Sequence, residues 1–332
     1  KFLPILIAVG LIATTYFALS NTSNDGLELH FTNYMSTFRK NYQSESEFTF
    51  RKSIFENNLN IINEHNALGE SWTMATNEFT DWTDEEYKKM LGLKSSPMGR
   101  KNTESLSNMP TNCKNLKRES IDHRDSGVVG KVVNQGSCGS CYAFSAIASV
   151  EAAYAKATGT FVKFSEQQIV DCDKYSHGCE GGLMSTSFMH LMRNAPIAEA
   201  DYKYTGRDGV CKEDRISTEY PELTIGYRVD VTHECLYEAL THNPVSIAIR
   251  AENSAFRHYR GGIIDGDSCG TELDHAVILT GYEADGDYFV IRNSWGASWG
   301  ENGYVRIRRG EDLGVCGINQ QNAQAIFDES EY

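Results

Sequence analysis

The sequence predicts an α+β protein with one helical lobe and one β-rich lobe, preceded by a separate helical segment. Residues 46–67 and 140–156 contain no Gly or Pro and are typical of helices. Short β-branched and aromatic runs at 244–251, 275–282 and 287–293 are typical of strands. Helices in the earlier part and strands in the later part favour a segregated α+β arrangement.

Composition excludes one class of function. The chain has 332 residues, enough for two domains or for one two-lobed enzyme with an accessory segment. Its formal charge is −14, and basic runs such as Lys117-Arg118 and Arg308-Arg309 never exceed two residues. Binding of nucleic acid requires clustered positive charge, so no nucleic-acid partner is expected.

The first twenty residues predict a cleaved signal peptide, residues 1–20. One basic residue precedes an apolar run from Phe2 to about Ala13, and small residues end the stretch. A signal anchor is the alternative, since a spanning helix needs about 18 apolar residues. Thr14 and Thr15 weaken that alternative. We expect passage through the secretory pathway without stable membrane association after signal cleavage.

Residues 27–70 predict amphipathic helices that pack on one another. Their apolar residues recur at helical spacing: Leu27, Phe31, Tyr34, Phe38, Phe48, Ile54, Phe55, Leu59 and Ile62. From Leu91 to Met109 the chain becomes polar, with Gly, Pro and several Ser residues, and predicts an exposed linker that is suited to proteolysis.

The region after residue 121 places a cysteine at the start of a helix. The Ala-rich stretch 140–156 predicts a buried helix with Cys141 in its first turn, and a second helix is expected around 165–170. Gly-rich loops follow at 177–182 and 259–270.

A predicted β-hairpin brings a histidine and an asparagine together. Ala284-Asp-Gly-Asp287 is a hairpin turn signal between the runs 275–282 and 287–293. Antiparallel pairing across it would place His275 and Asn293 within a few residues of each other. The helical half would then present a nucleophile to a base on the β-rich half.

These residue types can carry out nucleophilic catalysis. A helix N-terminus and an imidazolium lower a cysteine pKa from about 8.5 to roughly 3.5–7.5, which makes Cys141 a thiolate nucleophile. His275 would protonate the leaving amine, and Asn293 would orient its ring. Gln135 and the Cys141 N–H could form an oxyanion hole. Taken singly, such a His is more often structural, and such an Asn is more often a turn residue.

Cysteine usage leaves several alternatives open. Nine cysteines behind a signal peptide indicate an oxidising compartment, and the odd number leaves at least one thiol that counting does not identify. A thioredoxin-like redox pair of Cys138 and Cys141 is disfavoured because no βαβ pattern surrounds it. A zinc site lacks a second Cys or His pair, so no metal and no cofactor are expected.

The stretch "QGSCGSCYAFS" (135–145) resembles the active-site sequence of the papain/cathepsin family of cysteine peptidases. The resemblance implies a papain-like fold with a helical left lobe, a β-barrel-like right lobe and an active site in the cleft between them. It assigns the oxyanion glutamine to Gln135, the nucleophile to Cys141, the base to His275 in "LDHAVILTGY" and its orienter to Asn293 in "RNSWG". Trp295 would shield the His–Asn hydrogen bond.

The leader resembles a cathepsin L-type propeptide. Six residues fit E-x3-R-x3-F-x2-N-x3-I-x3-N: Glu47, Arg51, Phe55, Asn58, Ile62 and Asn66. "ATNEFTD" (75–81) follows a second family element, with Ala75 where Gly is usual. The implied organisation is an inhibitory propeptide over 21–116 and a peptidase domain over 117–332, divided into lobes of about 117–228 and 229–332. We hypothesise that acid loosens the propeptide by protonating carboxylates in its contact with the enzyme, in the region of Asp81, Asp84, Glu85 and Glu86.

The resemblance also implies three disulfides, Cys138–Cys179, Cys172–Cys211 and Cys269–Cys316. Cys113 would then leave with the propeptide, and Cys235 would be a buried structural thiol.

Substrate contacts follow from the same resemblance. Gly139 permits close approach of substrate backbone, Gly181 and Gly182 would pair with it, and Trp295 would border the leaving-group side. An apolar pocket for the residue two before the scissile bond (P2) would be lined by Leu183, Met184, Ala248 and Ala276, with Gln321 near its floor. No adjacent His pair indicates an occluding loop, which favours an endopeptidase.

The implied protein is a monomeric cysteine endopeptidase acting on protein and peptide substrates, with its own propeptide as intramolecular inhibitor. A lysosome- or vacuole-like acidic compartment or the extracellular space is the expected destination. A catalytically silent relative is the alternative, but it would normally have lost the nucleophile. Tyr142 and His123 depart from the family by replacing usual Trp residues.

Overall fold

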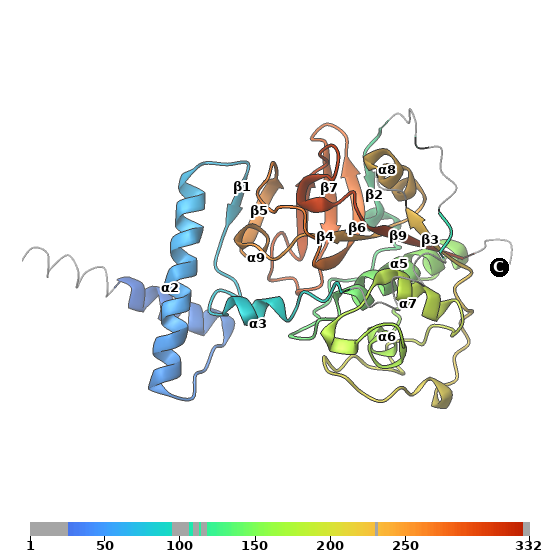
Figure 1. Ribbon diagram of the computed structural model, residues 1–332, viewed down its shortest axis with the longest axis horizontal. Coiled ribbons are helices and arrows are strands. Elements are labelled where there is room, and N and C mark those ends of the chain that lie inside the picture. The colour runs from blue at the N-terminus through green and yellow to red at the C-terminus, as the bar shows by residue number, and fades with distance from the viewer. Residues whose placement is uncertain (1–25, 95–105, 109–112, 114–117, 230–231, 328–332) are drawn as a thin grey trace, which may run out of the picture.

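The computed structural model describes residues 26–94, 106–108, 113, 118–229 and 232–327. Figure 1 shows a pair of crossing helices on one side of the molecule, a β-rich lobe and a helical lobe. The predicted signal peptide lies outside the described residues. Within those residues, no helix combines the length and apolar character that spanning a membrane requires.

The N-terminal part is a helical pair with its own small core. A helix over residues 26–38 packs against α2 (Glu45–Ala67), which begins where Ser44 accepts a hydrogen bond from the Glu47 N–H. The two helices enclose aromatic residues, with Phe31, Tyr34 and Phe55 buried at the centre. This packing stabilises a segment that is otherwise too small to bury much apolar surface.

The chain then leaves the helical pair and joins the β-rich lobe. Strand β1 (Trp72–Met74) pairs antiparallel with β5 (Tyr259–Ile264), and α3 (Asp84–Lys88) follows with a Thr83–Glu86 capping box. The expectation of an exposed linker from Leu91 is wrong at its start, because Leu91 and Leu93 are buried. Residues 95–105 and 109 of that linker lie outside the described part.

The helical lobe forms around α5 (Cys141–Thr158), which lies close to the predicted range. Helices α6 (Glu166–Cys172) and α7 (Met184–Leu191) pack around its Ala-rich surface. The small alanine side chains let neighbouring elements approach closely, and the helix ends at Gly159, whose φ is 72°. Short 3-10 helices complete this region: η1 (His123–Ser126), η2 (Gly178–Glu180) and η3 (Glu213–Arg215).

The β-rich lobe contains a sheet in the order β1-β5-β8-β7-β6-β4-β9-β3, with β2 also paired to β6. Its remaining elements are β2 (Ile121–Asp122), β3 (Ile225–Val229), α8 (His233–His242), β4 (Val245–Ile249), α9 (Ser254–Arg257), β6 (His275–Glu283), β7 (Tyr288–Arg292), β8 (Tyr304–Arg308), η4 (Val315–Gly317) and β9 (Asn322–Ile326). The predicted hairpin is present, with Glu283 opposite Tyr288. An irregularity between Leu279 and Gly281 shifts the register of β6.

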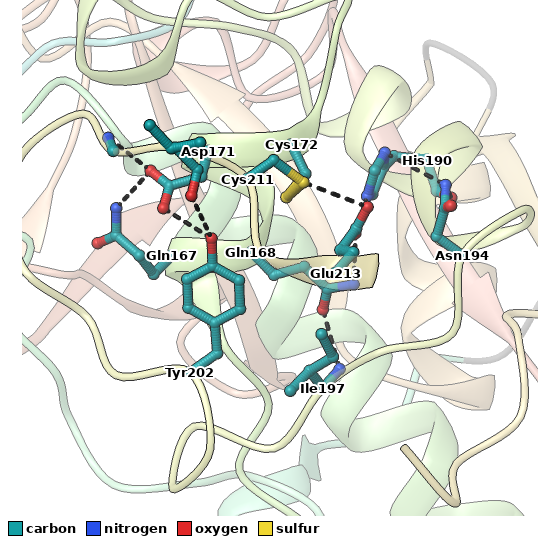
Figure 2. The surroundings of a disulfide bond; sticks show 12 residues. Gln167, Gln168, Asp171, Cys172, His190, Asn194, Ile197, Tyr202, Cys211 and Glu213 are labelled. Atoms are coloured by element: carbon teal, nitrogen blue, oxygen red, sulfur yellow. Dashed lines mark hydrogen bonds and ion pairs between the residues drawn. A yellow bond between two sulfur atoms is a disulfide. The ribbon is translucent and has the colours of Figure 1, made fainter. Parts of the chain in front are cut away.

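Four disulfides join the described cysteines, and Cys141 is the free one. Three of them are the pairs that the resemblance implied. In Figure 2, Glu213 lies beside Cys172–Cys211 and accepts hydrogen bonds from Gln168 and His190.

The fourth disulfide joins Cys113 to Cys235, so the interpretation of these residues as unconnected thiols is wrong. Cys235 lies in the first turn of α8, and the two Cα atoms are 4.7 Å apart, within the range for a disulfide. This bond ties the chain before residue 117 to the β-rich lobe.

The tether predicts that Cys113 stays with the C-terminal lobes after any processing cut. A cut near Lys117 should leave a fragment linked to Cys235, and a cut before Cys113 should leave an N-terminal extension. Intact mass measured without reductant should therefore include Cys113 in both cases, whereas reductant should release it only in the first. Cys235→Ser should release the fragment without reductant. A processed protein that has lost Cys113 under non-reducing conditions would contradict the prediction.

Candidate active site

Cys141 lies at the first position of α5, following Ser140. Its side chain is fully buried, and its Sγ accepts a hydrogen bond from the backbone N–H of Gly92 at 3.2 Å. The Ser140 hydroxyl contacts the Tyr204 hydroxyl at 2.7 Å, and that hydroxyl donates to the Gln135 carbonyl at 2.8 Å. The thiol therefore lies against the backbone of the N-terminal segment.

The β6–β7 hairpin brings His275 and Asn293 into contact. His275 Nε2 and Asn293 Oδ1 are 2.9 Å apart, and because an amide oxygen only accepts, Nε2 carries the proton. His275 Nδ1 is buried, and it has no hydrogen-bond partner within the described chain. Trp295 packs on the imidazole with ring centroids 4.7 Å apart and is itself buried. This arrangement leaves Nδ1 as the nitrogen that can accept a proton.

Gln135 lies beside the same site with its amide oriented by Ser294. The Ser294 hydroxyl donates to Gln135 Oε1 at 2.7 Å. Gln135 Nε2 donates to the carbonyl of Met90 at 2.9 Å and to that of Cys138 at 2.8 Å. The Met90 carbonyl of the N-terminal segment thus accepts a hydrogen bond from the amide that is predicted to bind the oxyanion.

The N-terminal segment continues through the predicted substrate-binding residues. The Gly182 N–H donates to the Gly92 carbonyl at 2.9 Å, and the Lys94 N–H donates to the Gly182 carbonyl at 3.1 Å. Leu93 belongs to the apolar cluster that contains the predicted pocket residues, Leu183, Met184, Ala248 and Ala276. Gln321 borders this cluster through its backbone, since its carbonyl accepts from the Ala248 N–H at 3.0 Å.

Glycine is required where the N-terminal segment meets the helical lobe. A Cβ atom added at Gly92 would lie 1.7 Å from the Gly139 carbonyl oxygen, and one at Gly139 would lie 3.0 Å from the Lys89 carbonyl oxygen. A Cβ at Gly181 would lie 2.7 Å from the Gly92 oxygen. The close backbone approach expected at Gly139 and Gly181 is therefore used here by the N-terminal segment.

Burial keeps both reactive groups neutral in this form. It raises the pKa of the Cys141 thiol to about 12 and lowers the pKa of His275 to about 4, although the Asn293 hydrogen bond opposes the second shift. At neutral pH the site holds a thiol and an uncharged imidazole, so it lacks the thiolate that attacks a carbonyl.

The two Trp replacements are accommodated by hydrogen bonds. Tyr142 is buried and donates its hydroxyl to the Gly178 carbonyl at 3.0 Å. His123 Nε2 lies 2.6 Å from the Leu240 carbonyl, and burial lowers the pKa of this histidine. Both side chains have a polar partner outside the predicted catalytic residues.

Sequence reasoning missed two residues at this site. Ser294 directly follows Asn293, so its position in the sequence could have marked it as a support for the catalytic group. Arg257 is buried and donates hydrogen bonds to the carbonyls of Phe79 and Trp82. No sequence motif marked Arg257, because its partners lie in the distant N-terminal segment.

Comparison with known families identifies both parts of the chain. Residues 117–326 match the papain family cysteine protease model, and residues 31–87 match the cathepsin propeptide inhibitor domain. The chain belongs to the papain family of cysteine proteases. It carries its own propeptide inhibitor domain and therefore has the organisation of a zymogen. The part preceding the peptidase domain is called the prosegment below.

Relatives resemble the chain over most of its length. Cysteine protease XCP2 of Arabidopsis thaliana is 40% identical over 308 residues, covering 90% of this chain and 86% of the relative. Papaya proteinase 4 of Carica papaya is 38% identical, covering 92% and 88% respectively. Among solved structures, the proform of the ragweed pollen cysteine protease Amb a 11 has a TM-score of 0.81 at 30% identity and covers 92% of this chain and 95% of that chain.

The close approach at Gly92 predicts that Gly92→Ala weakens inhibition by the prosegment. A methyl group cannot fit 1.7 Å from the Gly139 oxygen, so the prosegment backbone around Gly92 must move away from Cys141. Overpacking of this kind costs about 1–3 kcal/mol, so the inhibition constant of the separately added prosegment should rise about 5- to 150-fold. Gly26→Ala is the matched control, because its added methyl meets open space. An unchanged constant for Gly92→Ala would contradict this account.

The raised thiol pKa predicts slow alkylation of Cys141 in the zymogen. Because the thiolate is the reacting form and the thiol pKa is about 12, the rate of Cys141 alkylation by iodoacetamide in the zymogen should still be rising at pH 10, whereas the rate for the processed enzyme should level off at lower pH. Mass spectrometry of Cys141 labelling across pH measures both profiles. Identical profiles for the two forms would contradict the assignment.

Proposed function

We propose that this chain is a cysteine endopeptidase in which Cys141 is the nucleophile, His275 the acid and base, Asn293 the orienter and Gln135 an oxyanion-hole donor. The observation that carries the proposal is the path of the prosegment. Its backbone makes hydrogen bonds to the thiol, to the Gln135 amide and to Gly182. A peptide substrate would require the same three groups.

The mechanism follows from these contacts. Once the prosegment leaves, Cys141 is no longer covered, and His275 Nδ1 can take the thiol proton to give a thiolate–imidazolium pair. The sulfur attacks the scissile carbonyl, and Gln135 Nε2 and the Cys141 N–H stabilise the oxyanion. His275 then protonates the departing amine. It next deprotonates a water molecule, which hydrolyses the thioester and restores the thiol.

Leu93 supports an apolar preference in the substrate. It occupies the cluster formed by Leu183, Met184, Ala248 and Ala276, whose side chains are all buried. A large apolar residue at P2 would fill the same space after the prosegment has left. Burying one such side chain contributes about 1.5–3 kcal/mol, enough to dominate selection among neutral peptides.

The disulfides support an oxidising destination, either the secretory pathway ending in an acidic lysosome- or vacuole-like compartment or the extracellular space. A signal peptide over 1–20, a prosegment over 21–116 and a peptidase domain over 117–332 that acts as a monomer complete the proposal. Because of the Cys113–Cys235 disulfide, a cut near Lys117 would leave Cys113 attached to the enzyme.

The catalytic assignment predicts distinct losses for two substitutions. Processed enzyme should hydrolyse a peptide with Leu or Phe at P2, and Cys141→Ser should abolish turnover. Gln135→Ala should lower kcat by about 10²–10³-fold with little change in KM, because its hydrogen bond forms in the transition state. Tyr142→Phe, which removes a hydroxyl but no catalytic group, is the matched control. Turnover that survives in Cys141→Ser would place the nucleophile elsewhere.

We also propose that acid promotes prosegment release through Glu86. The side-chain hydrogen bonds from Arg51 hold the pKa of Glu86 below its usual value, with the Thr83 N–H and Lys89 acting in the same direction. The pair therefore stabilises the prosegment above the unfolded pKa of about 4.3. That stabilisation is lost as the pH falls through the lower folded pKa.

The Glu86 pair predicts the pH dependence of maturation. Glu86→Gln should speed processing several-fold at neutral pH and flatten its increase on acidification, because the ion pair is already absent. Glu64→Gln removes the same charge from an exposed position on α2 and serves as the control. Processing rates of the purified zymogen between pH 3 and pH 7 provide the measurement, because the lowered pKa of Glu86 places its titration at the acidic end of this range. Equal wild-type rates at both ends of this range would refute acid-promoted release.

A further inference from the structure

Arg257, the last residue of α9, is a buried cation whose polar partners come from the prosegment. Its guanidinium donates to the Phe79 carbonyl at 2.7 Å, to the Trp82 carbonyl and to Asp84 Oδ1 at 3.1 Å. The guanidinium also lies over the Tyr87 ring, 5.0 Å from its centroid. Only 4% of the residue is exposed.

Within the described residues of the peptidase domain, no carboxylate forms an ion pair with Arg257. Among the described residues, Asp84 of the prosegment is the carboxylate that forms an ion pair with Arg257. Two carboxylates near Arg257 in the sequence of the peptidase domain pair with Arg250, Asp274 at 3.1 Å and Glu252 at 3.7 Å, and Glu252 also pairs with Lys88 of the prosegment. Departure of the prosegment therefore leaves a guanidinium whose hydrogen-bond donors are open to a new acceptor.

Ring contacts place this guanidinium on the leaving-group side of the cleft. Tyr87 packs on Trp295 with ring centroids 5.6 Å apart, and Trp295 packs on His275 at 4.7 Å. The predicted P2 pocket lies in the other direction, where Leu93 and Lys94 follow Gly92 toward Gly182. Arg257 thus lies beyond Trp295, away from the acyl part of a substrate.

The course of the prosegment indicates how many substrate residues separate Cys141 from Arg257. From Tyr87 to Gly92 the chain is coiled, because Met90 N–H donates to the Tyr87 carbonyl and Leu91 N–H to the Lys88 carbonyl. Five residues rising about 1.5–2 Å each cover roughly 7.5–10 Å. An extended substrate, at about 3.3 Å per residue, covers this span with two or three residues.

We propose that Arg257 makes the processed enzyme select an acidic side chain two or three residues after the scissile bond. The inference rests on the proposed function, since it assigns a substrate preference to the same cleft. An Asp or Glu carboxylate would take the place of Asp84, and a substrate carbonyl would take the place of the Phe79 or Trp82 carbonyl. Guanidinium groups bind carboxylates through two parallel hydrogen bonds, which suits this exchange.

The test uses two pairs of internally quenched peptides with the same Leu at P2. Within each pair, Glu replaces Gln at either the second or the third position after the scissile bond. At low salt, processed wild-type enzyme should show a kcat/KM about three- to tenfold higher for the Glu peptide of one pair, the range for a partly screened ion pair. The preference should shrink at high salt.

Variants then assign the preference to one side chain. Arg257→Gln should bring the Glu/Gln ratio close to one, and Arg257→Lys should keep part of it. Arg260→Gln is the matched control, because Arg260 is exposed and donates to the Gly300 carbonyl. It removes the same charge from a nearby position and should leave the ratio unchanged.

The outcomes separate this inference from the proposed function. Hydrolysis of the Gln peptides with a Glu/Gln ratio of one in wild-type enzyme would overturn the role of Arg257 and leave the peptidase assignment intact. A ratio that persists in Arg257→Gln or disappears in Arg260→Gln would also overturn it. Absence of hydrolysis of all four peptides would overturn the proposed function itself. The wild-type ratio needs no variant, so it remains decisive even if Arg257→Gln fails to fold with its prosegment.

Discussion

The structure depends on the contact of one glycine backbone with the thiol of Cys141. Because Gly92 has no side chain, its peptide approaches Gly139 and donates to Sγ, and the neighbouring carbonyl of Met90 reaches Gln135. This contact covers the thiol, whose pKa burial raises, while the imidazole of His275 lies against Trp295 and keeps its hydrogen bond to Asn293. The prosegment thus blocks the thiol both by desolvation and by steric exclusion.

The position of that glycine is fixed from a distance by the folded prosegment. Asp81 is almost completely buried and accepts hydrogen bonds from Lys40, Tyr34 and Tyr42, which joins the helical pair to the chain that enters the cleft. Buried charges of this kind persist only when their partners are in place. Arg257 of the peptidase domain binds the same stretch of the prosegment through the carbonyls of Phe79 and Trp82. This stretch is therefore held both by the helical pair and by the enzyme.

Local patterns predicted the elements that carry chemistry, but long-range pairings lay outside their reach. The Ala-rich stretch without Gly or Pro located α5, and the turn signal located the β6–β7 hairpin, which in turn placed His275 next to Asn293. The Cys113–Cys235 bond spans a sequence separation of 122, and no local periodicity encodes such a contact. Leu91 was assigned to an exposed linker because most of the residues that follow it are polar. Its burial depends on contacts with residues distant in the sequence, which this local composition does not reveal.

The pairing of β1 with β5 has a consequence for the tendency of the processed enzyme to aggregate. β1 is the terminal strand of the sheet, so its removal turns β5 into an edge with unpaired backbone groups around Gly261 and Gly262. Free edges invite strand addition by other chains. In the zymogen β1 covers this edge, and the exposed charge of Arg260 on β5 is of the kind that opposes pairing with another chain.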